Sequence, residues 1–171
     1  IPLALPPLVA GVALLIFYGP STFGKMLSAF GLDIVYTPIG IVVAQFFVNL
    51  PYMVRVARSA FETINPRFEH VARTLGCTEW NAFRQVTLPL ARNGLIAGLV
   101  ITWSKAIGEF GAVMMLGGAT RMKTETLPIA LFLNMSTGDL DLAIAASVIL
   151  IVISVISFAV FERCSGERGV F

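Results

Sequence analysis

The chain has 171 residues, of which 57% are hydrophobic and 13% are charged, and its formal net charge is +2. A soluble globular domain carries about 25% charged residues, so this composition excludes an ordinary soluble domain and predicts a membrane protein. The small net charge and the lack of a long basic run argue against nucleic acid as a partner and favour membrane lipid.

Four apolar segments approach the length needed to cross a membrane, which is roughly 20 residues. The first is short and opens with IPLALPP, which reads like the middle of a protein, so we expect further helices upstream. A fifth apolar stretch, Thr126 to Met135, is about half a membrane thick and predicts a short surface or re-entrant helix. In chain order the predicted spans are Leu3 to Tyr18, Pro38 to Val54, Gly94 to Gly118, and Leu140 to Phe161.

Positive charges predict the orientation, since Lys and Arg accumulate in cytoplasmic loops. We therefore expect residues 55–92 and the C-terminus in the cytoplasm, where reduced Cys77 and Cys164 fit better than a disulfide. No repeat or linker marks a second domain, so residues 1–171 are predicted to form one transmembrane domain. The segments expected outside hold only Lys25, Arg121 and Lys123, whereas the cytoplasmic segments hold Arg55, Arg58, Arg67, Arg73, Arg84, Arg92, Arg163 and Arg168.

The polar stretch between the second and third spans predicts two short helices joined by a turn. Asn65 followed by Pro66 is a typical helix start, with Asn as N-cap and Pro at the first helical position. Gly76 fits the left-handed position that ends the first helix. Thr78 is suited to cap the second helix, and Pro89 is expected to stop it before the next span.

The first of these helices carries an apolar stripe formed by Phe68, Val71, Ala72 and Leu75, at spacings of three and four residues. Such a stripe must be buried against something. Two interpretations remain open on this pattern: the stripe packs on the cytoplasmic ends of the chain's own spans, or it is inserted into another protein.

This stretch resembles the cytoplasmic EAA signature of binding-protein-dependent ABC importer permeases, E-A-A-x3-G-x9-I-x-L-P. Gly76, Leu88 and Pro89 match the signature at its spacing, Ala72 matches its second Ala, and Val86 replaces its Ile. The resemblance implies that residues 62–89 form coupling helices, which dock into a groove on a separate cytoplasmic ATPase subunit. The docking residues it implies are Glu69, His70, Val71, Ala72, Leu75, Gly76, Val86, Leu88 and Pro89.

His70 and Val71 depart from the signature, because they stand where the family has Glu and Ala. His70 would offer a different set of hydrogen-bond donors and a pH-sensitive charge. Three alternatives stay open: His70 replaces the acidic contact, Glu69 compensates for it, or His70 is an exposed residue without a role.

The resemblance extends over essentially the whole chain. The stretches KAIGEFGAVMMLGG (Lys105 to Gly118) and TETLPIALFLNMSTGDLD (Thr124 to Asp141) resemble the oxyanion branch of these permeases, and the second is most similar to its molybdate and tungstate members. The family implies an all-α type I importer bundle with about four of six spans present here. It also implies a homodimer in a prokaryotic cell membrane, supplied by an extracytoplasmic oxyanion-binding protein.

Lys105 and Glu109 are ionisable residues inside the predicted third span, where a charge is costly and usually faces a partner or a cavity. Their spacing of four residues allows them to pair on one helix face. Either they form a structural ion pair, or they lie beside the translocation path, where Lys105 attracts a dianion and Glu109 prevents binding that is too tight.

No catalytic or metal-binding pattern is found. One His and two Cys without ligand spacing predict no metal site, and the lack of a G-x-x-x-x-G-K-[ST] loop predicts that ATP and Mg²⁺ bind the partner subunit. The predicted function is therefore a non-enzymatic permease for molybdate or tungstate. The alternatives are a sulfate or thiosulfate permease, a proton-coupled carrier that uses Lys105 and Glu109, and a membrane anchor without transport activity.

Overall fold

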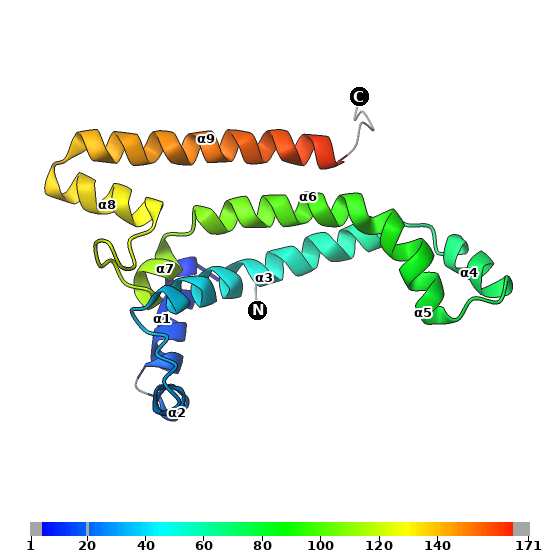
Figure 1. Ribbon diagram of the computed structural model, residues 1–171, viewed down its shortest axis with the longest axis horizontal. Coiled ribbons are helices and arrows are strands. Elements are labelled where there is room, and N and C mark those ends of the chain that lie inside the picture. The colour runs from blue at the N-terminus through cyan, green and yellow to red at the C-terminus, as the bar shows by residue number, and fades with distance from the viewer. Residues whose placement is uncertain (1–4, 20, 166–171) are drawn as a thin grey trace. The chain divides into compact units, whose positions relative to one another are not determined.

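The computed structural model describes residues 5–19 and 21–165, and within them every regular element is a helix (Figure 1). This confirms the predicted all-α class. Arg168 and the side chain of Cys164 lie outside the described residues, and the Cys77 thiol is free. The helices are α1 (Pro7–Tyr18), α2 (Thr22–Ala29), α3 (Pro38–Glu62), α4 (Arg67–Thr74), α5 (Glu79–Ala82), the π-helical η1 (Phe83–Thr87), α6 (Leu88–Ile107), α7 (Gly111–Leu116), α8 (Leu127–Thr137) and α9 (Leu140–Ser165).

Three helical stretches are long and apolar enough to cross a membrane: Pro38–Glu62, Glu79–Ile107 and Leu140–Arg163. A fourth span results if α1 and α2, which are bent against each other, are counted together. Alone, the 12 residues of α1 rise only about 18 Å, which is too short for a hydrocarbon core of about 30 Å. The predicted second and fourth spans are therefore confirmed as long apolar helices, and the first needs α2 to reach across.

The predicted third span, Gly94 to Gly118, is wrong in its bounds. The helix begins much earlier, at Glu79, and ends at Ile107, and the short helix α7 follows only at Gly111. Glycine is a poor helix former, and Gly108 stands at the break. Glu109 then accepts a hydrogen bond from the backbone N–H of Ala112 at 3.2 Å, which starts a new helix there.

The chain divides into two compact units, each described separately below. One consists of Ile1–Pro51 and Trp103–Val155, and the other of Tyr52–Thr102 and Ile156–Phe171. The division runs through α3, α6 and α9, so each of these helices contributes residues to both units. That residues 1–171 act as one transmembrane domain stays a prediction.

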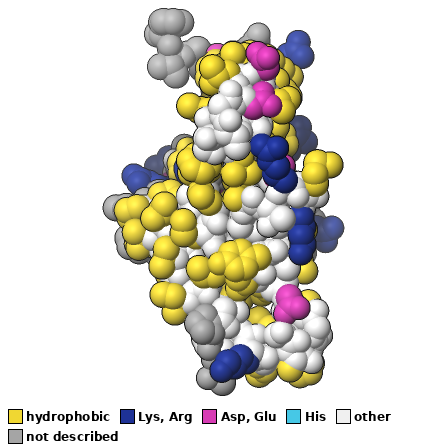
Figure 2. Space-filling view, turned by 90° about the vertical axis from the view of Figure 1, so that its left-hand side faces the viewer, with side chains coloured by type: hydrophobic (Ala, Val, Ile, Leu, Met, Phe, Trp, Pro, Cys, Tyr) yellow, Lys and Arg dark blue, Asp and Glu magenta, His cyan; other side chains and the backbone are white. Residues whose placement is uncertain are grey.

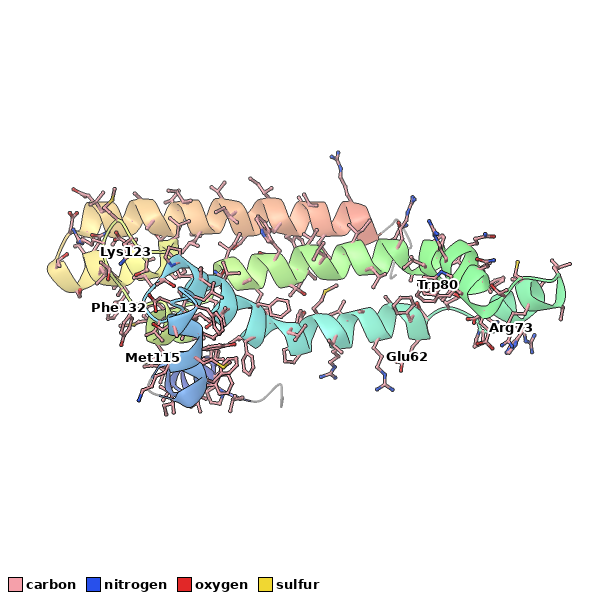
Figure 3. All side chains as sticks on the ribbon, turned by 60° about the horizontal axis from the view of Figure 1, so that its bottom comes forward. Glu62, Arg73, Trp80, Met115, Lys123 and Phe132 are labelled. Carbon is pink, nitrogen blue, oxygen red and sulfur yellow. The ribbon has the colours of Figure 1, made fainter. Side chains whose placement is uncertain are left out.

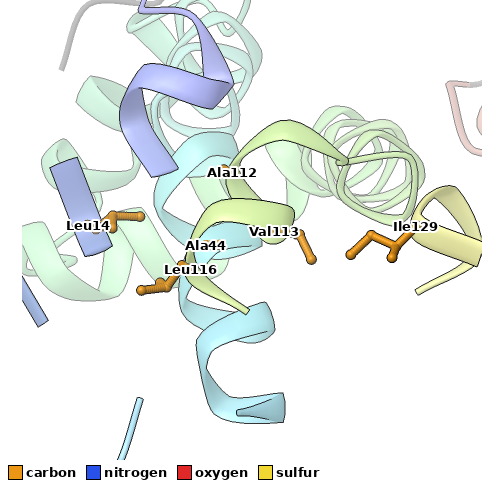
Figure 4. Close-up of a cluster of buried hydrophobic side chains, with 6 residues drawn as sticks. All are labelled: Leu14, Ala44, Ala112, Val113, Leu116 and Ile129. Carbon is orange, nitrogen blue, oxygen red and sulfur yellow. The ribbon is translucent and has the colours of Figure 1, made fainter. Parts of the chain in front are cut away.

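The core of the first unit lies where α1, α3, α7 and α8 meet (Figure 4). Gly11 permits the contact between α1 and α7, because a Cβ at this position would lie 2.7 Å from the Cα of Ala112. The short helix α7 is thus held on several sides by apolar side chains. The buried cluster is Leu14, Ala44, Ala112, Val113, Leu116 and Ile129.

The apolar stretch at residues 126–135 forms helix α8, as predicted, and its placement at the membrane surface stays a prediction. Gly138, in the left-handed conformation, ends the helix, and α9 begins two residues later at Leu140. Asn134 is buried in α8, and its side-chain oxygen accepts a hydrogen bond from Arg121 at 2.9 Å. This bond ties the loop before α8 to the helix.

Candidate functional site

The stretch from Asn65 to Pro89 forms a helical hairpin in the second unit, in which α4 and α5 lie side by side (Figure 1). The Asn65 side chain accepts a hydrogen bond from the N–H of Arg67 at 3.0 Å, but the N-cap of α4 is Pro66, one residue later than predicted. The Thr78 side chain accepts one from the N–H of Asn81 at 3.3 Å and caps α5, as predicted. Both helix starts thus lie within one residue of their predicted positions.

Gly76 makes the turn between the two helices. Its φ of +95° lies in the left-handed region, as predicted. The N–H of Gly76 donates to the Arg73 carbonyl at 3.0 Å, and the N–H of Cys77 donates to the Ala72 carbonyl at 3.1 Å. These two bonds form a Schellman motif, which satisfies carbonyls that the end of α4 would otherwise leave without partners.

Pro89 does not stop the second helix, and the prediction that it would is wrong. The helix continues from α5 through η1 into α6, so the hairpin leads directly into a candidate span. The N–H of Leu88 donates to the Phe83 carbonyl, five residues back, which makes the turn before the proline wider than an α-helical turn. A wider turn shifts the carbonyls that the proline ring would otherwise strike.

Three contacts fix the two arms of the hairpin against each other. Arg73 and Glu79 form an ion pair at 2.8 Å across the Gly76 turn. The Thr87 hydroxyl donates to a carboxylate oxygen of Glu69 at 3.3 Å, which joins α4 to η1. Ala72, with 8% of its surface exposed, packs in the interior of the hairpin. The hairpin is thus held as one body.

The apolar stripe of α4 faces outward except for Ala72. Phe68 and Val71 are more than half exposed, and Leu75, at the tip, is 81% exposed. Trp80 on α5 is 67% exposed and lies on the same hairpin (Figure 3). Of the two interpretations of the stripe, this exposure favours insertion into another protein over packing on the chain's own spans.

His70 lies on the exposed side of α4, where it lines an open groove of about 690 Å³ together with Arg73, Cys77 and Glu79. Glu69 is half-buried, and its carboxylate is engaged by Thr87 inside the hairpin. His70, at the position of the family's Glu, is therefore at the surface, whereas the carboxylate of Glu69 contacts the second arm. Because this carboxylate is already engaged, compensation by Glu69 for the family's acidic contact is the less favoured alternative.

The remaining residues of the signature lie on the second arm. Val86 is half-buried in η1, whereas Leu88 and Pro89 are exposed at the start of α6. η1 and α6 are continuous, so the second arm leads directly into the candidate span Glu79–Ile107. The structure thus brings the two halves of the signature together on one hairpin that continues into a span.

Lys105 and Glu109 do not share a helix face, because α6 ends at Ile107. No ion pair joins them among the residues that the structure describes, where the ion pairs are Arg58–Glu62 and Arg73–Glu79. Lys105 is exposed, whereas Glu109 has 5% of its surface exposed and accepts a hydrogen bond from the N–H of Ala112 in the first turn of α7. Within residues 5–19 and 21–165 the expected pair is thus replaced by an exposed Lys105 without an ion pair and a buried, hydrogen-bonded Glu109.

Gln45 is a site residue that the sequence alone did not single out. Its side-chain amide donates to the carbonyl of Ala106 at 2.9 Å, at the point where α6 ends. Asn49, one turn further along α3, donates to the Gln45 carbonyl at 2.7 Å and is buried. The feature of the sequence that could have identified Gln45 is the presence of two amide side chains in an otherwise apolar span.

Within residues 5–19 and 21–165, no group of three His, Cys, Asp or Glu side chains is arranged to hold a metal ion. The described site consists of an exposed apolar surface on the hairpin and a helix break. At the break the Gln45 side chain donates to the Ala106 carbonyl, and the Glu109 side chain accepts from the Ala112 N–H. In a membrane, irregular backbone is tolerated where protein or a water-filled cavity surrounds it.

Comparison with known proteins gives consistent matches. The model of the family described as binding-protein-dependent transport system inner membrane component matches residues 1–164. The chain is 39% identical over 155 residues to the molybdenum transport system permease protein ModB of Mycobacterium bovis, with 90% of this chain and 58% of the relative covered.

Two sulfate transport relatives are similar to a comparable degree. The chain is 38% identical over 152 residues to the sulfate transport system permease protein CysT of Escherichia coli, covering 88% of this chain and 55% of the relative. It is 34% identical over 170 residues to CysW of Synechocystis, covering 99% of this chain and 62% of the relative. The chain therefore spans less than two thirds of the length of these relatives.

Proposed function

Since the chain belongs to the family of binding-protein-dependent transport system inner membrane components, we propose that it is the permease subunit of an ABC importer for a tetrahedral oxyanion. The observation that carries this proposal is the hairpin of residues 65–89. It exposes Leu75 and Trp80 at its surface, is braced internally, and continues without a break into the candidate span Glu79–Ile107.

In this proposal the hairpin docks on a cytoplasmic ATPase subunit. Exposed large apolar side chains on a polar hairpin are typical of a partner interface. ATP and Mg²⁺ bind the partner, and its closure moves the hairpin as a rigid body. Because η1 and α6 form one helix, this motion is passed to the span and changes the accessibility of the path.

Six arginines between Arg55 and Arg92 support a cytoplasmic location of the hairpin in a multi-pass prokaryotic cell membrane protein. The C-terminus then lies on the same side. An extracytoplasmic binding protein delivers the anion to the other side, and a second copy of the permease completes the path. Lys105 attracts the dianion, and buried Glu109 limits how tightly it is held.

Molybdate or tungstate is the substrate we propose. The support is the 39% identity to a molybdenum transport system permease protein, together with the similarity of residues 124–141 to molybdate and tungstate permeases. Sulfate is the second candidate, because the relatives from Escherichia coli and Synechocystis that transport sulfate are 38% and 34% identical.

The test uses the full-length permease, co-purified with its ATPase and reconstituted with its binding protein. Uptake of molybdate, tungstate and sulfate is measured in proteoliposomes with ATP, with a non-hydrolysable ATP analogue, and with a proton gradient alone. We expect ATP-dependent uptake in which molybdate or tungstate outcompetes sulfate. Uptake driven by the proton gradient without ATP would instead establish a secondary carrier, and absence of any flux would support a membrane anchor.

A further inference from the structure

A second polar pocket, of about 440 Å³, lies within the first unit. Its walls come from the end of α1, from α2, from the segment that leads into α3, and from the loop between α7 and α8. Lys25 from α2 and Lys123 from that loop, almost 100 residues apart in the sequence, both line it. Its other polar side chains are Tyr18, Ser28, Asp33, Tyr36 and Thr37.

The charges of this pocket favour an anion. Neither Lys25 nor Lys123 forms an ion pair within residues 5–19 and 21–165. Asp33, the acidic residue of the lining, accepts a hydrogen bond from the Ser28 hydroxyl at 2.6 Å. The lining of the pocket thus holds two ammonium groups and one carboxylate, which is hydrogen-bonded. Figure 2 shows the face that carries α2 and α8, on which basic side chains stand exposed beside apolar ones.

One wall of the pocket is held in a strained conformation. Tyr36 has a φ of +57°, which is uncommon for a residue other than glycine. Its N–H donates to the Leu116 carbonyl at 2.9 Å, and its ring packs against Gly118, where a Cβ would lie 2.8 Å from Cδ1. Strain of this kind persists where the surroundings fix it, and it is concentrated at functional sites.

The loop that carries Lys123 is fixed as well. The N–H of Lys123 donates to the Thr120 carbonyl at 3.1 Å, and the N–H of Thr120 donates to the buried hydroxyl of Thr124 at 3.1 Å. The backbone beneath Lys123 is therefore held in place, while its side chain remains exposed at the pocket (Figure 3). A fixed backbone that carries an exposed ammonium group is suited to receive an anion.

We infer that this pocket is an entry site, in which Lys25 and Lys123 receive a hydrated divalent oxyanion before it reaches the path. The inference rests on the proposed function and on its orientation. Lys25 and Lys123 both lie in segments that the distribution of positive charges predicts to be outside the cell, where the binding protein would deliver the anion. The pocket has room for an anion with several waters, each of which occupies about 30 Å³, so it holds the ion loosely.

The first experiment detects binding without requiring transport. The described chain contains three lysines, Lys25, Lys105 and Lys123. The full-length permease with its ATPase, in nanodiscs, is acetylated with a membrane-impermeant amine reagent, and each lysine is followed by mass spectrometry. We expect tungstate, molybdate or sulfate to slow acetylation of Lys25 and Lys123 severalfold, relative to nitrate at equal ionic strength. Equal labelling in tungstate and nitrate would overturn the inference.

The second experiment separates anion entry from docking of the binding protein. Lys25→Gln and Lys123→Gln are compared with Lys25→Arg and Lys123→Arg, which keep the charge. We expect each Gln variant to lower maximal uptake at saturating binding protein by on the order of tenfold, and each Arg variant to preserve it. The binding-protein concentration that half-stimulates the ATPase should stay unchanged.

Two results would count against the entry site. A rise in the half-stimulating concentration, with normal maximal uptake, would show that the lysines dock an acidic surface of the binding protein. Normal uptake by the Lys25→Gln Lys123→Gln double variant would show that the pocket is not used. Failure of the proposed function is distinct, because wild-type proteoliposomes would then take up no oxyanion with ATP, while the acetylation experiment would still report binding.

Discussion

The side-chain amide of Gln45 donates a hydrogen bond to the carbonyl of Ala106, 61 residues later in the chain, at 2.9 Å. The same carbonyl also accepts a hydrogen bond from the N–H of Glu109 at 3.1 Å. The carbonyls at the end of a helix lack the partners of the helix interior, and in an apolar environment an unsatisfied group is costly. Gln45 thus supplies a second, side-chain donor at the end of α6, at the break before α7.

Replacing Gln45 by Leu should lower stability, because it removes the side-chain donor and leaves the Ala106 carbonyl with the Glu109 N–H alone. We expect a loss of about 1 kcal/mol, seen as a lower apparent Tm of the purified full-length protein in detergent. Phe46→Leu, at the exposed neighbouring position, is the control and should be near wild type. An unchanged Tm for Gln45→Leu would mean that the Glu109 N–H satisfies the carbonyl by itself.

Gly76→Val should abolish ATP-coupled uptake while the protein still reaches the membrane. The cost comes from the backbone, since a β-branched residue is forced to a φ of +95°, and not from space, since no atom lies within 4 Å of a Cβ there. The control is Gly138→Val, at a position with a φ of +81° and equally open space, outside both the hairpin and the lysine-lined pocket. Uptake assays and membrane immunoblots are compared for both. Loss of uptake in both variants to the same extent would refute a special role of the hairpin turn.

Leu75→Asp should weaken binding of the ATPase subunit without unfolding the permease. Leu75 is 81% exposed, so the substitution removes little internal packing, but it places a charge where we propose an apolar contact. We expect at least about tenfold weaker association, measured by co-purification and by titration of the ATPase in nanodiscs. Phe30→Asp, at a position 77% exposed outside the hairpin, is the control. Undiminished association of Leu75→Asp would contradict the docking surface.

Glu109 accepts a hydrogen bond in the first turn of α7, and its proposed role in the path can be tested separately from this structural one. Glu109→Ala removes the acceptor for the Ala112 N–H and should lower stability by about 1 kcal/mol, measured as a lower Tm. Glu109→Gln keeps a side-chain oxygen and should preserve the Tm, while uptake slows because a dianion is released less readily. Full uptake activity in the Gln variant would reduce the role of Glu109 to capping.

Several features of the hairpin were predictable from sequence because each depends on one or two local residues. Thr78 caps α5 through its own side chain, the Asn65 side chain accepts a hydrogen bond from the first residue of α4, and Gly76 adopts a conformation that other residues rarely take. The apolar stripe was predictable from its spacing, and its exposure was one of two alternatives that the pattern left open. The structure favours the exposed alternative at Phe68, Val71 and Leu75.

Hydropathy determined that the chain is helical and membrane-spanning, because apolar length is a property of the sequence alone. It did not determine where the third span breaks or that the helix continues through Pro89. Those outcomes depend on hydrogen bonds that satisfy the backbone: Glu109 at Ala112, and the wider turn before Leu88. Gln45 is hydrogen-bonded to Ala106, and Lys25 and Lys123 line the same pocket. Both arrangements join residues far apart in the chain, so only tertiary packing could decide them.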